Sequence, residues 1–269
     1  MIISQIKHGL GNQLFQYAAG LSLARHLNAK LLLDLDVTSY ETDFRRELCL
    51  KYFEIDDITT ELKPKYEDIV FNLYIEPHFH FDNNFYNSSN FTYLSGYWQT
   101  DKYFIGIKEE IMRKFCVRHE YIAHLDIDRL KFDDFNSINL HIRRGDYAHD
   151  TFLGILSMDY YYRAITYFIN HFENVRFYIF SDDIQWVKKN LNLKADHIFI
   201  SGDYTKNSIE DFYLMQQCKH HIIANSTFSW WAAWLCKYQQ KRIIAPTKWF
   251  MEREDADIKD LIPKTWLTI

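Results

Sequence analysis

Two adjacent arginines form the part of the sequence whose chemistry is easiest to interpret. Arg143 and Arg144 directly follow 137–142, which we predict to be a strand. A guanidinium at a strand end needs a counter-charge, and its planar fork matches the oxygens of a diphosphate. Because side chains alternate along a strand, we expect His141 and Arg143 to share one face and Arg144 to point toward a structural carboxylate. Asp146 is a candidate for pairing with an arginine, for binding substrate or for acting as a base. A structural salt-bridge cluster is the alternative for the whole run.

A second candidate is the glycine-containing run at 8–13, which reads HGLGNQ. Gly9 and Gly11 permit a tight turn and close approach of a ligand to the backbone. The first amides of the helix that we expect next would suit a phosphate. The run lacks the Gly-Lys-Ser/Thr ending of a Walker A loop, and Leu14 stands where a dinucleotide-binding fingerprint has its third glycine. A plain strand-to-helix turn is the alternative.

Acidic and hydroxyl side chains follow two further apolar strands. A carboxylate of Asp182 or Asp183 can accept hydrogen bonds from the N1–H and amino group of guanine, and Asp182 can instead cap a helix. Together with the Asp-x-Asp at 34–36, this pair leaves a metal site open as a hypothesis. Ser226 and Thr227 begin a predicted helix, where they can cap it or hold a phosphate. The tryptophans that follow are expected to build core rather than bind sugar.

The elements that position these runs alternate between strand and helix patterns. The predicted strands are 2–6, 30–35, 137–142, 175–180, 197–200, 220–224 and 242–245, and the predicted helices are 13–27, 159–172, 184–191, 208–218 and 228–237. Such alternation favours a parallel, doubly wound sheet, where ligands bind beyond the carboxyl ends of the strands. All four polar runs follow strands, so we expect them to gather around one ligand. The less regular middle, 37–135, is interpreted as loops and short elements that could face an acceptor.

The composition is that of an ordinary globular protein. The 269 residues are 48% hydrophobic and 25% charged, which suggests roughly one to two domains. A net charge of −5 argues against a nucleic-acid partner. Aromatic residues make up 17%, enough for a large core and, as the sharper hypothesis, a sugar-binding surface. Neither a transmembrane run nor a signal peptide is recognised, and the four scattered cysteines favour reduced thiols in a cytoplasmic protein.

Taken together, five runs resemble the bacterial α-1,2-fucosyltransferases of glycosyltransferase family 11. These runs are GLGNQLFQYA at 9–18, GYWQ at 96–99, HIRRGDY at 141–147, SDD at 181–183 and NSTFSWWA at 225–232. The resemblance implies an α/β fold of GT-B type, with two Rossmann-like domains facing a central cleft. Residues 1–135 would form the acceptor-side domain and residues 136–269 the GDP-fucose-binding domain. His8 departs from the glycine that is usual in the family, and the chain is shorter than many members.

The resemblance also implies the reaction: inverting transfer of L-fucose from GDP-β-L-fucose to the 2-hydroxyl of a terminal galactose-type residue, without a metal or other cofactor. In that reaction Arg143 would bind the β-phosphate, Asp183 would read guanine, and Ser226 and Thr227 would touch phosphate. Asn12 would close over the sugar diphosphate from the other domain.

Gly9, Gly11 and His141 complete the predicted donor site, and Asp146 joins Arg143 and Asn12 as the candidate catalytic residues. The acceptor would be a galactose-containing oligosaccharide or a lipid-linked glycan, with peripheral membrane association as an option. Another GDP-sugar, another acceptor position, or a nucleotide-sugar-binding protein without catalysis are the alternatives.

Overall fold

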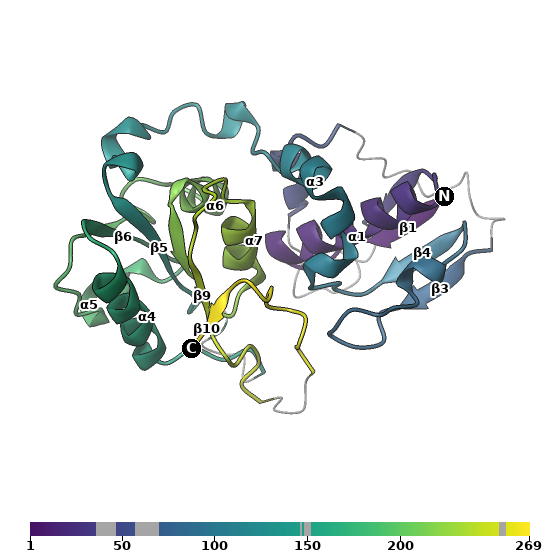
Figure 1. Cartoon of the computed structure of the whole chain (residues 1–269). Helices are drawn as coiled ribbons and strands as arrows, with labels where there is room; N and C mark the ends of the chain where they lie inside the picture. The colour runs from purple at the N-terminus through teal and green to yellow at the C-terminus, as the bar shows by residue number, and fades with distance from the viewer. Residues whose placement is uncertain (36–46, 57–69, 146, 148–151, 253–256) are drawn as a thin grey trace. The chain divides into compact units, whose positions relative to one another are not determined.

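The computed structural model describes residues 1–35, 47–56, 70–145, 147, 152–252 and 257–269, drawn in colour in Figure 1. The chain forms two compact units. Unit 1 comprises Met1–Cys116 and Asp257–Pro263, and unit 2 comprises Val117–Ala256 and Lys264–Ile269. Among the described residues, no helix is both long and apolar enough to cross a membrane.

Unit 1 is built on a parallel sheet. Within the described residues its strands are β1 (Ile2–Gln5), β2 (Leu31–Asp34), β3 (Asn72–Ile75) and β4 (Thr92–Ser95), in the order β2-β1-β4-β3. From β1 the chain passes through α1 (Leu10–His26) to β2 on one side, whereas β4 lies on the other side of β1. The order therefore reverses between β1 and β4, which creates a topological switch point at their carboxyl ends.

Helix α1 is a core helix of unit 1. Its residues from Leu10 to Ala24 are buried apart from Asn12, and basic residues lie in its last turn, where they complement the helix dipole. An aromatic cluster packs nearby in the same unit, with Phe85, Trp98 and Tyr103 in contact at ring-centroid distances of 4.7–5.4 Å. After β4 the unit continues into α3 (Lys108–Lys114).

Unit 2 contains the second parallel sheet. Its described strands are β5 (Asn136–Ile142), β6 (Val175–Ser181), β7 (His197–Phe199), β8 (His220–Ile222), β9 (Ile243–Ala245) and β10 (Leu267–Thr268), in the order β10-β9-β8-β5-β6-β7. The connecting helices are α4 (Met158–His171), α5 (Ile184–Asn190), α6 (Ser208–Gln217) and α7 (Thr227–Leu235). This is the doubly wound order of a Rossmann fold, with the switch point between β5 and β8.

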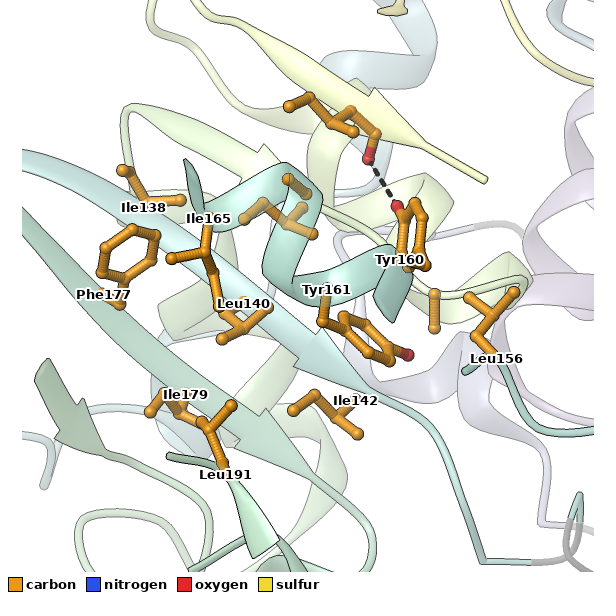
Figure 2. Close-up of a cluster of buried hydrophobic side chains, with 14 of the residues drawn as sticks. Ile138, Leu140, Ile142, Leu156, Tyr160, Tyr161, Ile165, Phe177, Ile179 and Leu191 are labelled. Carbon is orange, nitrogen blue, oxygen red and sulfur yellow. Dashed lines mark hydrogen bonds between the residues drawn. The ribbon is translucent and has the colours of Figure 1, made fainter. Parts of the chain in front are cut away.

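The core of unit 2 lies between its sheet and helix α4. Figure 2 shows one buried cluster that includes Leu140 and Ile142 of β5, Ile179 of β6, and Tyr160 and Tyr161 of α4. The Tyr160 hydroxyl, though buried, donates to main-chain oxygens at the ends of β8 and β9, 2.7 and 3.2 Å away. A buried phenol that is satisfied in this way fixes α4 against the sheet without an unpaired polar group.

Short 3-10 helices fill the connections in both units. They are Cys49–Tyr52, Phe85–Asn87, Asp101–Tyr103, Ile105–Ile107, His119–Tyr121, Asp128–Leu130 and Phe132–Asp134. The last three precede β5 and belong to unit 2, so the contact boundary at Cys116/Val117 falls earlier than the predicted 135/136. The physical reason is packing: Phe132 contacts the ring of Tyr178 on β6 at 4.4 Å, and the Tyr178 hydroxyl donates to the Leu130 oxygen.

Every predicted strand and helix of the second half is present within a few residues of its expected bounds. The α/β fold prediction is therefore confirmed for each unit. In the first half the prediction did not find β3 or β4, each only four residues long. Helix α1 also begins at Leu10, so Gly11 and Asn12 lie in its first turn rather than in the predicted turn before it.

Candidate active site

Strand register places the paired arginines beside the paired aspartates. Ile142 at the end of β5 lies opposite Ser181 at the end of β6, so the residues after both strands run side by side. Arg143 Nη1 lies 3.0 Å from Asp182 Oδ2, and Arg144 Nε lies 3.2 Å from Asp183 Oδ2. The carboxyl edge of unit 2 thus carries two ion pairs from two motifs that are far apart in sequence.

Arg144 belongs to a structural group, as expected. Its guanidinium lies 3.4 Å from the ring centroid of Trp186, and its partner Asp183 caps helix α5 by accepting from the Trp186 amide at 3.3 Å. The cap hypothesised at Asp182 is therefore wrong by one residue, because the Asp182 carboxylate turns back toward the loop after β5. The guanine-reading role of Asp183 stays a prediction; each carboxylate oxygen has two acceptor sites, and the side chain is 40% exposed.

Asp182 holds the loop that follows β5. Its Oδ1 accepts from the Arg144 amide at 2.9 Å, while its Oδ2 pairs with Arg143. A Cβ atom at Gly145 would lie 2.2 Å from that Oδ2, so only glycine permits this close approach. Asp146 lies outside the described residues, and its roles stay predictions.

A buried hydrogen-bond chain supports the end of β6 and the residues after it, which carry Asp182, and sequence reasoning missed it. The Ser181 amide donates to Ser201 Oγ at 3.0 Å, and Ser201 Oγ donates to Asp211 at 2.8 Å. The Ser181 hydroxyl in turn accepts from the Asp183 amide at 3.0 Å. Burial raises the pKa of Asp211 to about 6, against the opposing hydrogen bonds from Thr205 and Ser201. A lone aspartate inside a helix pattern gave no signal for this role.

The residues after β8 lie on the other side of β5. Leu140 is opposite Ile222, which brings the start of α7 alongside the loop that carries Arg143. Ser226 occupies the N-cap position of α7, yet within the described residues its side chain makes no capping bond, contrary to the capping hypothesis. Thr227 is half-buried in the first turn of this helix. The first amides of α7 and the guanidinium of Arg143 therefore flank the switch point of unit 2.

Asn225 has a structural task instead. It is buried, and its Nδ2 donates to the oxygens of Leu153 and Trp249 at 2.9 and 3.0 Å, which ties two distant loops to the end of β8. The tryptophans of the same motif build core, as predicted: Trp230 and Trp231 are fully buried and their rings contact each other at 5.1 Å.

His141 lies in the buried end of β5. Burial, reinforced by the charge of Arg143, lowers its pKa to about 3, so the ring is neutral at physiological pH. Its ring contacts that of Phe228 on α7 at 5.7 Å, and Nδ1 has no hydrogen-bond partner among the described residues. A neutral imidazole here can offer a hydrogen bond but no positive charge, and its donor-binding role stays a prediction.

In unit 1, hydrogen bonds join two motifs that flank the other switch point. The Tyr97 hydroxyl lies 3.0 Å from Nε2 of His8, and Gln99 Nε2 donates to Oδ1 of Asn12 at 2.9 Å. Gly9 is the N-cap of α1 and has no side chain with which to cap the helix. The first amides of α1 therefore lie at the carboxyl edge of β1. The resemblance quoted both motifs, but nothing in the sequence indicated that they bond to each other.

Three buried or half-buried side chains fix these loops. Gln16 accepts from the Lys7 amide at 2.8 Å and donates to the Gly96 oxygen at 3.2 Å, so one side chain spans both loops. Gln13 likewise donates to the His8 oxygen and accepts from the Cys49 amide. Glu76, which sequence reasoning missed, accepts the two consecutive amides of the loop after Gly96; burial raises the pKa of its carboxyl.

The metal hypothesis gains no support from these residues. In the described ranges no group of three or more His, Cys, Asp or Glu side chains is placed to hold a metal ion. Asp34 accepts the Tyr93 hydroxyl at 2.5 Å, and Asp36 lies outside the described residues. Metal independence stays a prediction, as does the meeting of Asn12 with Arg143, since these two residues belong to different units.

Several known proteins are similar to this chain in sequence or in fold. An α-1,2-colitosyltransferase of Escherichia coli is 32% identical over 100% of this chain and 99% of its own length. A galactoside 2-α-L-fucosyltransferase of Caenorhabditis elegans is 29% identical over 99% of this chain and 78% of its own length. The fold is similar to that of the α-1,6-fucosyltransferase NodZ, from Bradyrhizobium, in a crystal soaked with GDP-fucose (TM-score 0.53, 16% identity, 87% and 91% of the two chains).

The fold comparison identifies the two doubly wound units as the GT-B type, as predicted. The profile of glycosyl transferase family 11 matches residues 2–269, nearly the whole chain and both switch points. The chain belongs to glycosyltransferase family 11.

Proposed function

We propose that this protein transfers L-fucose from GDP-β-L-fucose to the 2-hydroxyl of a terminal galactose-type residue, with inversion to an α-1,2-fucoside. The observation that carries the proposal is the switch point of unit 2, where Arg143 and the start of α7 flank the ends of β5 and β8. In a doubly wound sheet this is where a nucleotide binds. Family membership supplies the reaction type, glycosyl transfer.

The chemistry of this edge suits a departing diphosphate. In the displacement, the bond from the sugar anomeric carbon to the β-phosphate oxygen breaks, and its electrons pass to GDP. The acceptor oxygen bonds to the same carbon from the opposite face, and its proton passes to a base, for which Asp146 is the candidate, or to water. Arg143 would meet the growing negative charge with paired hydrogen bonds, and the amides and hydroxyl at Thr227 would add donors that need no rearrangement.

The paired aspartate has a second use in this proposal. Asp182 holds Arg143 by one nitrogen at 3.0 Å, which keeps the guanidinium in place before the donor arrives. A preorganised cation costs little rearrangement during the reaction, so more of its attraction lowers the barrier. Asp183 would accept hydrogen bonds from guanine with the same two oxygens that accept from Arg144 Nε and from the Trp186 amide of α5.

The names of the relatives support the position of the new linkage more strongly than the identity of the transferred sugar. Both named enzymes act at position 2: one is an α-1,2-colitosyltransferase and the other a galactoside 2-α-L-fucosyltransferase. Colitose is L-fucose that lacks the 3-hydroxyl group. The 32% identity to the colitosyltransferase therefore favours GDP-colitose as a second candidate donor.

One experiment decides between these donors. Purified protein would be given GDP-fucose or GDP-colitose with a panel of galactosides, with EDTA in a parallel set, and the linkage would be read by NMR. The proposal predicts an α-1,2-fucoside, with kcat/KM higher for GDP-fucose, whether or not EDTA is present. A clear preference for GDP-colitose would support the second candidate. Transfer from neither donor, or to another hydroxyl, would contradict the proposal.

A further inference from the structure

The loops at the switch point of unit 1 contain backbone strain. His8 and Trp98 have φ angles of 64° and 59°, in the left-handed region that residues other than glycine rarely adopt. His8 lies in the loop between β1 and α1, and Trp98 lies in the loop after β4. Strained residues persist where their surroundings hold them, and they concentrate at functional sites. The same edge of the same sheet thus carries two of them.

The His8 side chain has a defined partner in the other loop. Its Nε2 lies 3.0 Å from the Tyr97 hydroxyl, and the two rings are 5.4 Å apart. The ammonium group of Lys7 lies 5.2 Å from the centroid of the Tyr97 ring. The imidazole of His8 therefore reaches the loop after β4, where it contacts Tyr97.

The loop that carries Tyr97 is held from below. Both carboxylate oxygens of Glu76 bind its backbone, accepting from the Tyr97 amide at 2.6 Å and the Trp98 amide at 2.9 Å. Gly96 is required here, because a Cβ atom would lie 2.4 Å from Glu76 Cβ. The residues on either side of Tyr97 are buried while Tyr97 itself is half-buried. Tyr97 is therefore the part of this rigid loop that reaches the surface.

The chemistry of this edge suits a neutral sugar. Tyr97 and His8 offer a phenol and an imidazole, and the neighbouring Asn12 and Gln99 offer amides. The edge of unit 2, by contrast, carries the guanidinium of Arg143. A phenol oxygen can donate one hydrogen bond and accept others, so one hydroxyl can contact both an imidazole and a sugar hydroxyl.

We infer that the Tyr97 hydroxyl binds a hydroxyl of the acceptor sugar, and that His8 is the positioning residue that orients it. This inference rests on the proposed function, since it assigns the acceptor of that same reaction. The step involves hydrogen bonding alone and no proton transfer. His8 thus bears its backbone strain because the imidazole must reach the second loop.

A double-mutant cycle tests the pair. The variants are Tyr97→Phe, which removes only the hydroxyl, His8→Gly, which relieves the strain while removing the imidazole, and the double variant. Lys131→Gly is the matched control, because Lys131 also has a left-handed backbone (φ 55°) but is exposed in unit 2. Steady-state kinetics would vary the galactoside and the GDP-sugar separately, and a thermal melt would accompany each variant.

We expect Tyr97→Phe to raise the acceptor KM about tenfold, with kcat and the donor KM within about twofold of wild type, because a contact made equally in the bound ground state and in the transition state is lost. His8→Gly should raise the acceptor KM by a similar factor and melt within about 2 °C of wild type. The double variant should resemble either single variant, because the two side chains act together. Lys131→Gly should leave the kinetics unchanged.

Three other outcomes would each overturn a different part of the account. An unchanged acceptor KM in Tyr97→Phe, in an active enzyme, would overturn the inference and leave the proposed function standing. Effects of the two single variants that multiply in the double variant would overturn the positioning role of His8. A wild type that transfers neither fucose nor colitose would overturn the proposed function itself.

Discussion

Replacing Arg143 with lysine would separate the effect of charge from that of geometry at the proposed donor site. In the structure, Nη1 of Arg143 binds Asp182 at 3.0 Å, and 21% of the side chain is exposed at the carboxyl edge of the sheet. A guanidinium has five N–H donors in a planar fork, so it can hold Asp182 and still offer paired bonds to a diphosphate. A lysine ammonium in this place would have to divide a single point charge between the two partners.

The expected magnitude follows from losing one preorganised donor group. Such a loss costs about 3 to 4 kcal/mol of transition-state stabilisation, or about 10²- to 10³-fold in kcat. We expect Arg143→Lys to fold normally, because the partly exposed ion pair with Asp182 can reform and is worth little to stability.

The assay is single-turnover transfer from GDP-fucose, with equilibrium binding of GDP measured alongside. Arg144→Lys is the control: Arg144 stacks on Trp186 at 3.4 Å and pairs with Asp183, so its loss should lower stability more than kcat. A folded Arg143→Lys variant that keeps more than about a tenth of wild-type kcat would refute the role given to Arg143.

Three further predictions concern the residues that support the two sites. Gly145→Ala should lower kcat at least about tenfold, since the new Cβ would lie 2.2 Å from Asp182 Oδ2 and displace that carboxylate; wild-type kinetics would contradict this. Asp211 has a folded pKa of about 6, above the unfolded value of about 3.9, so the folded state binds more protons between these pH values and loses up to about 3 kcal/mol of stability as pH rises from about 4 to 6. The free energy of unfolding, measured with urea at several pH values in that range, should depend less steeply on pH for Asp211→Asn than for wild type. The same pH dependence in both proteins would refute the effect. Glu76→Gln should lower the free energy of unfolding by about 1 to 2 kcal/mol, because a side-chain NH2 would then face a backbone amide donor; an unchanged melting temperature would argue against it.

The fold of unit 2 was largely predictable because apolar-rich strand patterns alternate with helix patterns and polar residues follow several of the strands. The run 175–180 before Asp182 is an example, and β6 (Val175–Ser181) matches it closely. Unit 1 was harder, since Asn72–Ile75 is mostly exposed on the edge of its sheet and its side chains lack the alternation of a half-buried strand. Short strands of this kind are specified by their neighbours rather than by their own pattern.

The candidate site was predictable in its types of residue but not in its pairings. Two arginines after a strand indicated an anion site, yet nothing in the sequence assigned Asp182 to Arg143 and Asp183 to Arg144. Those partners depend on the register that sets Ile142 opposite Ser181, which is a long-range property of the sheet. The clamp that Glu76 forms on a loop after a different strand was invisible for the same reason.

The central claim is that the switch point between β5 and β8 binds the nucleotide diphosphate, and a crystal structure of the protein with GDP tests it most directly. The proposal predicts the β-phosphate within hydrogen-bonding distance of both the Arg143 guanidinium and the first turn of α7. Diphosphate bound elsewhere, with the Arg143 guanidinium still on Asp182 and out of contact with the phosphates, would contradict it.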